Sequence, residues 1–283
     1  MNKAIPETAG HLVAIGGAED KESEMEVLRR VFELAPGGNG EVAVFVTASG
    51  FPDDVFAAYD AAFRQLGAAD VHQCNPRERR NAADSELVDI VERCGVFFFS
   101  GGDQLRLTNT LGGSPVLEAL RTSYLEHGAV IAGTSAGAMA QSTTMITGSS
   151  SVDALHKGSV QMASGLGFVD GVIIDSHFLE RGRFTRLMEV GATNPEQLGI
   201  GLGEDAGVII HPNRVLEAVG PGHVILVDSR DLATSNVAEA SEGDPVAIEN
   251  VVMHALINGH GFDIDGRRYL DGESLEASVG RQA

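Results

Sequence analysis

The chain has 283 residues, and its 43% hydrophobic content is typical of a globular protein with a substantial core. Its net charge of −20 repels nucleic acid and anionic membranes and favours a cationic partner, although an acidic surface also keeps a protein soluble, including at high salt. No run approaches the roughly 20 apolar residues of a membrane span. The first residues lack the apolar region of a signal peptide, so we expect a cytoplasmic protein with no membrane partner.

Short apolar runs alternate with longer amphipathic stretches in the first half of the chain. The pattern predicts strands at residues 12–15, 42–46, 70–73, 96–99 and 129–132, and helices at 23–34, 53–66 and 85–94 and in a region ending at 126. Continuous apolar strands that alternate with helices indicate a parallel sheet covered on both faces.

The second half of the chain has a weaker rhythm. Residues 142–164 are rich in Ser, Thr and Gly and predict a loop or hairpin insertion. Further strands are predicted at 172–174, 199–202, 208–210 and 224–227, a helix at 183–191, and a closing hairpin from 250–258 and 263–270. We therefore expect one domain over residues 1–283: an α/β fold with a doubly wound, mostly parallel sheet flanked by helices and a C-terminal β-hairpin.

Small and polar residues follow nearly every predicted strand. In open parallel sheets, ligands gather at the carboxyl ends of the strands, so these segments mark a substrate cleft. The fifth predicted strand is followed by G-T-S-A-G at 133–137 and then by a short helical stretch. This is the context of the nucleophile-elbow pattern G-x-S-x-G, although the same letters also suit an ordinary strand-to-helix turn. The pattern makes Ser135 the candidate nucleophile.

A serine nucleophile needs a base, an orienting carboxylate and oxyanion donors. Of the nine histidines, His177 ends the run V-I-I-D-S-H at the functional edge and is the preferred base. The predicted strand 199–202 ends at the same edge and supplies Glu204 as the acid, with Asp205 beside it. The order Ser, His, Glu differs from that of α/β-hydrolases, in which the acid precedes the histidine. The amides of Gly102 and Ala136 are the expected oxyanion donors.

The run R-G-R-F-T-R places three arginines, Arg181, Arg183 and Arg186, directly after the candidate base. Guanidinium groups at an active-site edge suggest the binding of a substrate carboxylate. The alternative is a solvated helix start, paired with Glu180 and Glu189.

The combined motifs resemble the cyanophycinase family, serine hydrolases with a fold like that of class I glutamine amidotransferases. The resemblance rests on G-G-A-E-D-K at 16–21, S-G-G-D-Q at 100–104, G-T-S-A-G-A at 133–138, D-S-H-F-L-E-R-G-R-F-T-R-L at 175–187 and G-I-G-L-G-E-D at 199–205. It implies a triad of Ser135, His177 and Glu204, and a substrate pocket that includes Gln104, Asp175, Ser176, Arg181, Arg183 and Arg186.

The resemblance also implies a substrate and an assembly. Cyanophycinases release β-Asp-Arg dipeptides from a poly-aspartate backbone that carries arginine on its β-carboxyls, and the family suggests a homodimer. Where the family commonly reads Asp-Gln-His-Phe, this chain has Ser176 in place of Gln, and one pocket residue can redirect specificity. An aspartyl dipeptidase or other small isopeptide hydrolase, and a noncatalytic amidotransferase-like module, are therefore the alternatives.

No cofactor is expected. The sequence has no H-E-x-x-H motif, P-loop or complete G-x-G-x-x-G. Its two cysteines, Cys74 and Cys94, form no C-x-x-C pair, so we expect neither a disulfide framework nor a thiolate metal site.

Overall fold

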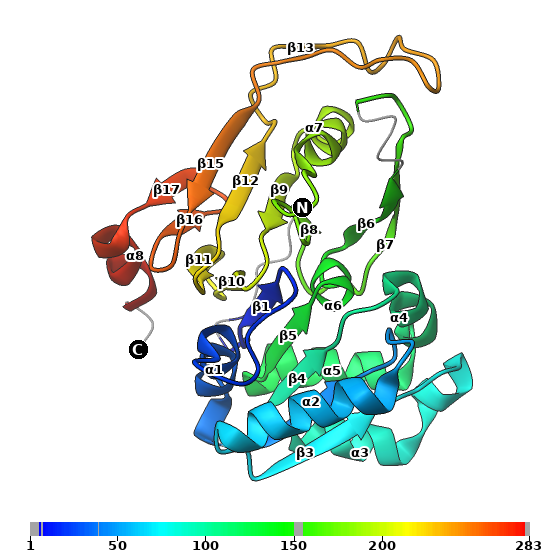
Figure 1. Cartoon of the computed structure of the whole chain (residues 1–283), viewed down its shortest axis with the longest axis vertical. Coiled ribbons are helices and arrows are strands. Elements are labelled where there is room, and N and C mark those ends of the chain that lie inside the picture. Colours follow the sequence, from blue (N-terminus) through cyan, green and yellow to red (C-terminus); the bar gives the residue numbers. More distant parts are fainter. Residues whose placement is uncertain (1–5, 7, 39, 150–154, 281–283) are drawn as a thin grey trace.

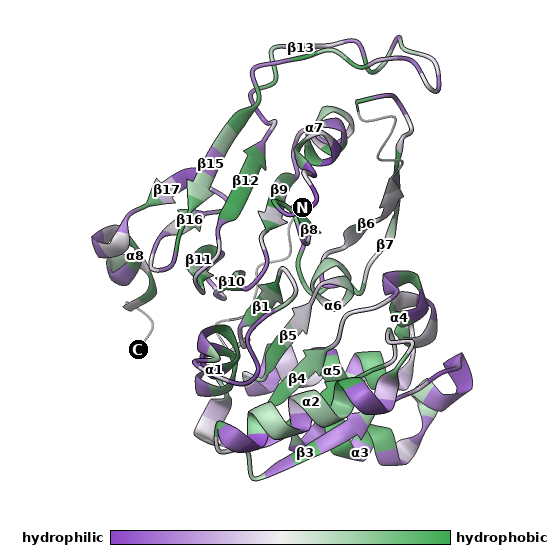
Figure 2. Ribbon diagram, in the orientation of Figure 1, coloured by the Kyte–Doolittle hydropathy of each residue, from purple (hydrophilic) through white to green (hydrophobic). Residues whose placement is uncertain are grey.

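Five parallel strands form one half of a nine-stranded sheet in the computed structural model, which describes residues 6, 8–38, 40–149 and 155–280 (Figure 1). Their order is β1, β5, β4, β2, β3, with bounds Leu12–Ile15, Val130–Thr134, Val96–Phe99, Glu41–Phe45 and Asp70–Cys74. β3 is the edge strand, is only partly buried, and is coloured mainly hydrophilic in Figure 2.

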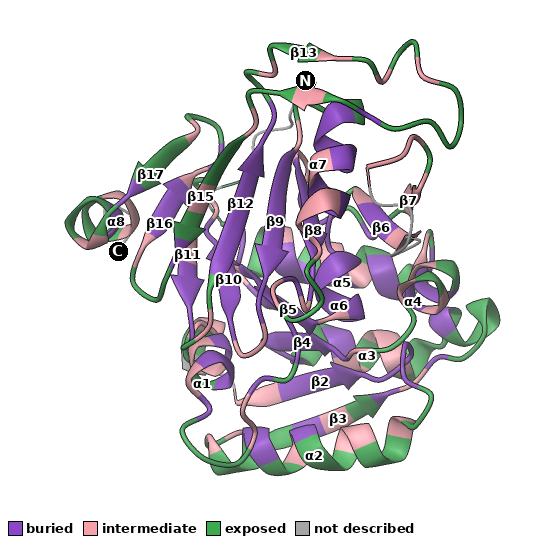
Figure 3. Ribbon diagram, turned by 45° about the horizontal axis from the view of Figure 1, so that its top comes forward, coloured by how far each residue is buried: buried purple, intermediate pink, exposed green. Residues whose placement is uncertain are grey.

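Helices cover both faces of this parallel half, as the alternating side chains of β4 show. Phe97 and Phe99 pack into one core with α3 (Ser85–Arg93) and α5 (Pro115–His127). Val96 and Phe98 face the opposite core, with α1 (Glu26–Glu33) and α2 (Pro52–Gln65). Successive side chains of a strand point to opposite faces, so a strand covered on both sides is apolar throughout. The doubly wound α/β architecture is confirmed, and Figure 3 shows the central strands buried beneath helices with exposed outer faces.

Four antiparallel strands extend the same sheet beyond β1. They are β10 (Gly207–Ile210), β11 (Val215–Val219), β16 (Gly261–Asp263) and β17 (Arg268–Leu270). A second sheet has the order β15 (Val252–Leu256), β12 (Val224–Asp228), β9 (Leu198–Leu202) and β8 (Val172–Asp175), with only β8 and β9 parallel. Helix α7 (Phe184–Thr193) packs Leu187 and Val190 against this second sheet.

Shorter elements complete the described part of the chain. They are the hairpin of β6 (Thr144–Ser149) and β7 (Val160–Ser164), the pair β13 (Thr234–Ser235) and β14 (Ile248–Glu249), the helices α4 (Gln104–Leu111), α6 (Ala136–Met139) and α8 (Gly272–Val279), and the 3₁₀ turns η1 (Pro36–Gly38) and η2 (Arg79–Ala83). Among all the residues that the structure describes, no helix has both the length and the apolar character that crossing a bilayer requires.

The expected hairpin at 142–164 is present as β6–β7. The predicted pairing of 250–258 with 263–270 is wrong: β15 pairs with β12 in the second sheet, and the C-terminal hairpin is β16–β17. Helix α1 begins at Glu26, not at residue 23, because the Asp20 carboxylate binds the amides of Glu22, Ser23 and Met25 and holds that segment in a turn. Strand β11, helix α8 and the separate second sheet were not predicted.

Candidate active site

Ser135 stands between β5 and α6 in a strained conformation, with φ 52° and ψ −111°. Two glycines permit the turn: a Cβ on Gly133 would lie 2.6 Å from the carbonyl of Gly137, and one on Gly137 would lie 2.1 Å from Phe99 O. The Ser135 amide donates to Ile15 O at 2.9 Å. A non-glycine residue in such a conformation persists only where its surroundings hold it, and this turn exposes the serine at the end of the sheet.

The side chains of His177 and Glu204 meet Ser135 in a hydrogen-bonded chain. Ser135 Oγ lies 3.1 Å from His177 Nε2, and His177 Nδ1 lies 2.7 Å from Glu204 Oε1. The two residues follow β8 and β9, whose parallel pairing brings both strand ends to one edge. Donation of Nδ1–H to Glu204 leaves Nε2 to accept the serine proton, which is the arrangement of a serine-protease triad. The three residues chosen from the sequence are therefore together.

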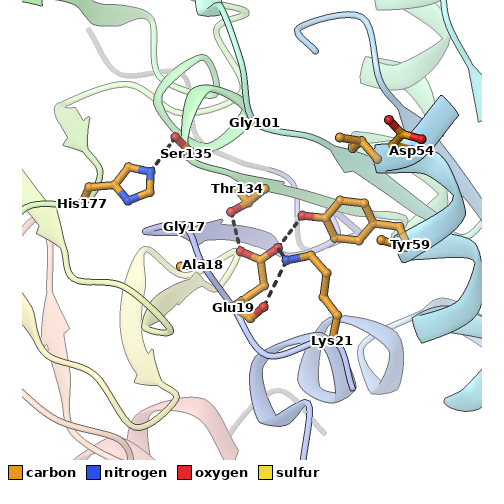
Figure 4. Close-up of a pocket in the computed structure, with 12 residues that line it drawn as sticks. Gly17, Ala18, Glu19, Lys21, Asp54, Tyr59, Gly101, Thr134, Ser135 and His177 are labelled. Atoms are coloured by element: carbon orange, nitrogen blue, oxygen red, sulfur yellow. Dashed lines mark hydrogen bonds and ion pairs between the residues drawn. The ribbon is translucent and has the colours of Figure 1, made fainter. Parts of the chain in front are cut away.

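A cavity of about 530 Å³ opens beside Ser135 and His177. Its wall includes Gly17, Glu19, Lys21 and Tyr59 (Figure 4). The size is within the range of small-ligand pockets.

Buried Glu19, which was not singled out from the sequence, organises that wall. Its carboxylate accepts hydrogen bonds from Tyr59 OH and from Thr134 Oγ1, the latter at 2.6 Å, and pairs with Lys21 Nζ at 3.0 Å. Burial and the Glu19 charge raise the pKa of Tyr59 well above its usual value, so Tyr59 stays a protonated donor. The sequence signals for Glu19 are its place after the first predicted strand and inside the motif G-G-A-E-D-K at 16–21, neither of which gives it a role.

The two expected oxyanion donors lie next to the nucleophile's loop. Ala136 opens α6, and the first N–H groups of a helix have no intrahelical acceptor. Gly102 has φ 141°, and a Cβ there would lie 2.1 Å from Ala48 O, so only glycine fits. A Cβ on neighbouring Gly101 would lie 3.9 Å from Ser135 Oγ, which places this loop against the serine. Oxyanion binding by the two amides stays a prediction.

None of the six predicted substrate-binding residues is part of the described cavity wall. Asp175 is fully buried and pairs with Arg183, at 3.2 Å, and with both Nε (2.8 Å) and a terminal nitrogen of Arg186. Burial lowers the pKa of Arg183. These two arginines thus bind the internal carboxylate of Asp175. A substrate carboxylate would have to share the arginines with Asp175 or displace it from them.

Of the other three predicted substrate-binding residues, two already contact other parts of the protein and one is exposed. Gln104 Nε2 donates to Ile146 O at 3.0 Å and so fastens α4 to β6. Ser176 is buried, with its Oγ 3.3 Å from Met139 Sδ, and Arg181 is exposed. Substrate contact by this group stays a prediction.

One cluster away from the cavity contains metal-ligand residue types. Glu41, His72 and Cys94 each place a potential ligand atom within 4.8 Å of the others. Burial raises the pKa of Cys94 to about 12, and Arg93 Nε lies 3.8 Å from the Glu41 carboxylate. The contacts of Glu41 with Arg93 and with His72 Nε2, at 3.0 Å, account for the cluster as a hydrogen-bonded, ion-paired group at the sheet edge.

Comparisons with known proteins show the family and the fold. The model of Peptidase family S51 matches residues 12–217. A cyanophycinase from Geminocystis herdmanii (strain PCC 6308) is 36% identical over 250 residues, 88% of this chain and 91% of that protein. A cyanophycinase from Nostoc sp. (strain PCC 7120) is 34% identical, over 92% of this chain and 87% of that protein. A crystal structure of a peptidase from an acI-B1 Actinobacterium superposes with a TM-score of 0.61 at 20% identity, covering 90% of this chain and 97% of that one, which supports the fold.

Proposed function

This chain belongs to peptidase family S51, and we propose that it is a serine exopeptidase that hydrolyses cyanophycin, multi-L-arginyl-poly-L-aspartate, to β-Asp-Arg dipeptides. The observation that carries the proposal is the hydrogen-bonded chain from Ser135 through His177 to Glu204. The family membership and the names of the relatives support the substrate. The charge of −20 suits an arginine-rich polymer, because it raises the local concentration of a cationic substrate.

The proposed reaction has two balanced steps. His177 Nε2 takes the hydroxyl proton of Ser135 as Oγ bonds to the carbonyl carbon of the scissile peptide. The C–N bond then breaks, and His177 gives that proton to the departing amine, which leaves an acyl-enzyme. Water attacks the ester with His177 as base, the bond between the acyl carbon and Ser135 Oγ breaks, and His177 returns the proton to Oγ as the acid product leaves. The Gly102 and Ala136 amides stabilise the negative oxygen in both steps, and Glu204 stabilises the histidine cation.

A second candidate, an aspartyl dipeptidase or other small isopeptide hydrolase, is favoured by one observation. Ser176 stands where the cyanophycinase pattern that the sequence resembles has Gln, and its hydroxyl faces Met139 inside the protein. This chain therefore lacks the Gln side-chain amide at that position, which leaves one fewer group to bind an extended substrate. A single domain over residues 1–283, a homodimer and a cytoplasmic location remain predictions.

The test is to incubate purified protein with cyanophycin and with matched α-linked and β-linked aspartyl dipeptides, and to identify the products by mass. Release of β-Asp-Arg from the polymer is the expected result. Ser135→Ala should lower kcat by roughly 10⁶-fold, because the members of a triad act as a unit. Cleavage of dipeptides without cleavage of the polymer would support the second candidate. Near-normal activity in Ser135→Ala would contradict both.

A further inference from the structure

Glu19 is a buried carboxylate, only 3% exposed, at the edge of the candidate active site. Three donors converge on its two oxygens. Thr134 Oγ1 donates to Oε2, whereas Tyr59 OH and Lys21 Nζ bind Oε1. A buried ionised carboxylate is tolerated only when it is paired and hydrogen-bonded, and this one is both.

One of those donors belongs to the nucleophile elbow. Thr134 is the residue before Ser135, and its side chain is tied to Glu19 across 115 positions of sequence. A second tie, from the Ser135 amide to Ile15 O at 2.9 Å, comes from the last residue of β1, directly before the β1–α1 connection that carries Glu19. The strained φ of Ser135 is therefore restrained from one side by residues 15–19 (Figure 4).

The same connection also contacts the base. The His177 amide donates to Gly16 O at 2.9 Å. The imidazole lies so close to Gly17 that a Cβ there would be 2.3 Å from the ring.

The loop that carries Glu204, the candidate acid, is also joined to the β1–α1 connection. The Asp205 amide donates to Gly17 O at 2.9 Å, and the Asp20 amide donates to Asp205 Oδ1 at 3.0 Å. Asp205 is the neighbour of Glu204. Residues 15–20 thus contact the segments that carry all three members of the triad, and the Glu19 carboxylate is the side chain that fastens this turn to the elbow.

We propose that Glu19 is a positioning residue for the triad, which holds Ser135 in line with His177 through Thr134. The inference rests on the proposed function in taking Ser135 as the nucleophile. Gln is nearly isosteric with Glu but has one acceptor oxygen and no charge, so Glu19→Gln removes the ion pair with Lys21 and one of the two acceptors for Thr134 and Tyr59 with little change in volume. A misplacement of about 1 Å at reacting groups can lower a rate roughly 10²-fold.

The test measures the rate at which a small, uncharged fluorophosphonate labels Ser135, well below the unfolding temperature of each variant. We expect Glu19→Gln and Thr134→Val each to slow labelling roughly 10²-fold. The double variant should be no slower than either single one, because the two side chains act through one contact. Hydrolysis should lose kcat with little change in KM.

Two matched controls separate positioning from loss of stability. Glu189 is equally buried, at 3% exposure, and accepts from Ser159 and from the Val160 amide in the second half of the chain. Thr110 is a buried threonine of α4. Glu189→Gln and Thr110→Val should lower thermal stability but leave the labelling rate within about threefold of wild type.

Each other outcome is decisive. Wild-type labelling rates in Glu19→Gln, or additive losses in the double variant, would overturn the positioning role while leaving the proposed function intact. A rise in KM alone, with unchanged labelling, would show that Glu19 binds a substrate cation instead. Failure of wild-type Ser135 to label at all would overturn the proposed function, and the inference with it. Labelling without hydrolysis of cyanophycin would reject only the substrate, and the variants would still test positioning.

Discussion

At the scale of single residues, Gly17 shows how little room the candidate base has. Its φ is 112°, and a Cβ would lie 2.3 Å from His177 Cε1 and 2.6 Å from Nε2. We expect Gly17→Ala to displace the imidazole and to lower kcat roughly 10²-fold. Gly113→Ala is the matched control, since Gly113 also has positive φ, at 69°, but no atom within 4 Å of its added Cβ. Equal activities of the two variants in a hydrolysis assay would contradict this explanation.

Glu204 is the other residue whose role can be measured directly. Glu204→Gln keeps the size of the side chain but removes the charge that fixes the tautomer of His177, so we expect kcat to fall roughly 10⁴-fold. Neighbouring Glu180 accepts the Glu204 amide at 3.1 Å and does not contact the imidazole's hydrogen-bonded chain, and Glu180→Gln should lower kcat less than tenfold. Steady-state kinetics of the two variants make the comparison. Similar losses of kcat in the two variants would mean that the rate depends on negative charge at this edge and not on the contact between Glu204 and His177.

His177 and Glu204 could be predicted together because they follow β8 and β9, whose parallel pairing brings both strand ends to one edge. Ser135 follows β5 of the other sheet, and the G-x-S-x-G pattern is what marked it. Glu19 also follows a strand, but its role could not be predicted. Its importance comes from contacts with Tyr59 and Thr134, which lie 40 and 115 positions away and depend on how α2 packs on the sheet. Motifs reveal reactive residues more readily than the side chains that hold them in place.

At the scale of elements, the Asp175 carboxylate joins the end of β8 to α7 through Arg183 and Arg186. Asp175→Asn would leave two adjacent guanidinium groups without their shared buried counter-charge, which costs roughly 3–5 kcal/mol. We expect a fall in Tm on the order of 10 °C in thermal unfolding. Asp53→Asn, at an exposed α2 position where the carboxylate accepts from Gln73, should change Tm by no more than about 2 °C. A normal Tm for Asp175→Asn would show that the ion pair is not structural.

The arginines also show why the pocket was harder to predict than the triad. Their spacing after His177 predicted substrate binding, yet an acidic partner was available eight residues before Arg183, at Asp175. A sequence lists the charges but does not say which pairs form. The strands 172–174 and 199–202 were similarly located correctly without any indication that they belong to a second sheet, since apolar runs carry no information about which partner they pair with.

At the scale of the whole molecule, four side chains connect α1, β1 and the antiparallel extension of the large sheet. His11 stacks edge-on against His211 with ring centroids 5.0 Å apart. His211 Nε2 lies 2.9 Å from the Glu217 carboxylate, which Arg30 approaches to 3.4 Å. Burial, followed by the nearby His211 and Arg30, lowers the pKa of His11 to about 4. The group therefore couples folding to pH.

The direction in which stability changes with pH follows from proton binding at His11. Between pH 4 and the ordinary histidine pKa of 6.5, the unfolded chain binds a proton at His11 that the folded protein excludes. The contribution of His11 to the free energy of unfolding is therefore fully present above pH 6.5 and is lost as the pH drops toward 4. At pH 5 the loss is roughly 2 kcal/mol, or about 5 °C in Tm. His11→Asn removes this linkage, and between pH 7.5 and pH 5 its Tm should fall about 5 °C less than that of wild type. His127→Asn, at the exposed end of α5, should behave like wild type. Parallel Tm curves for wild type and His11→Asn would mean that another group controls acid stability.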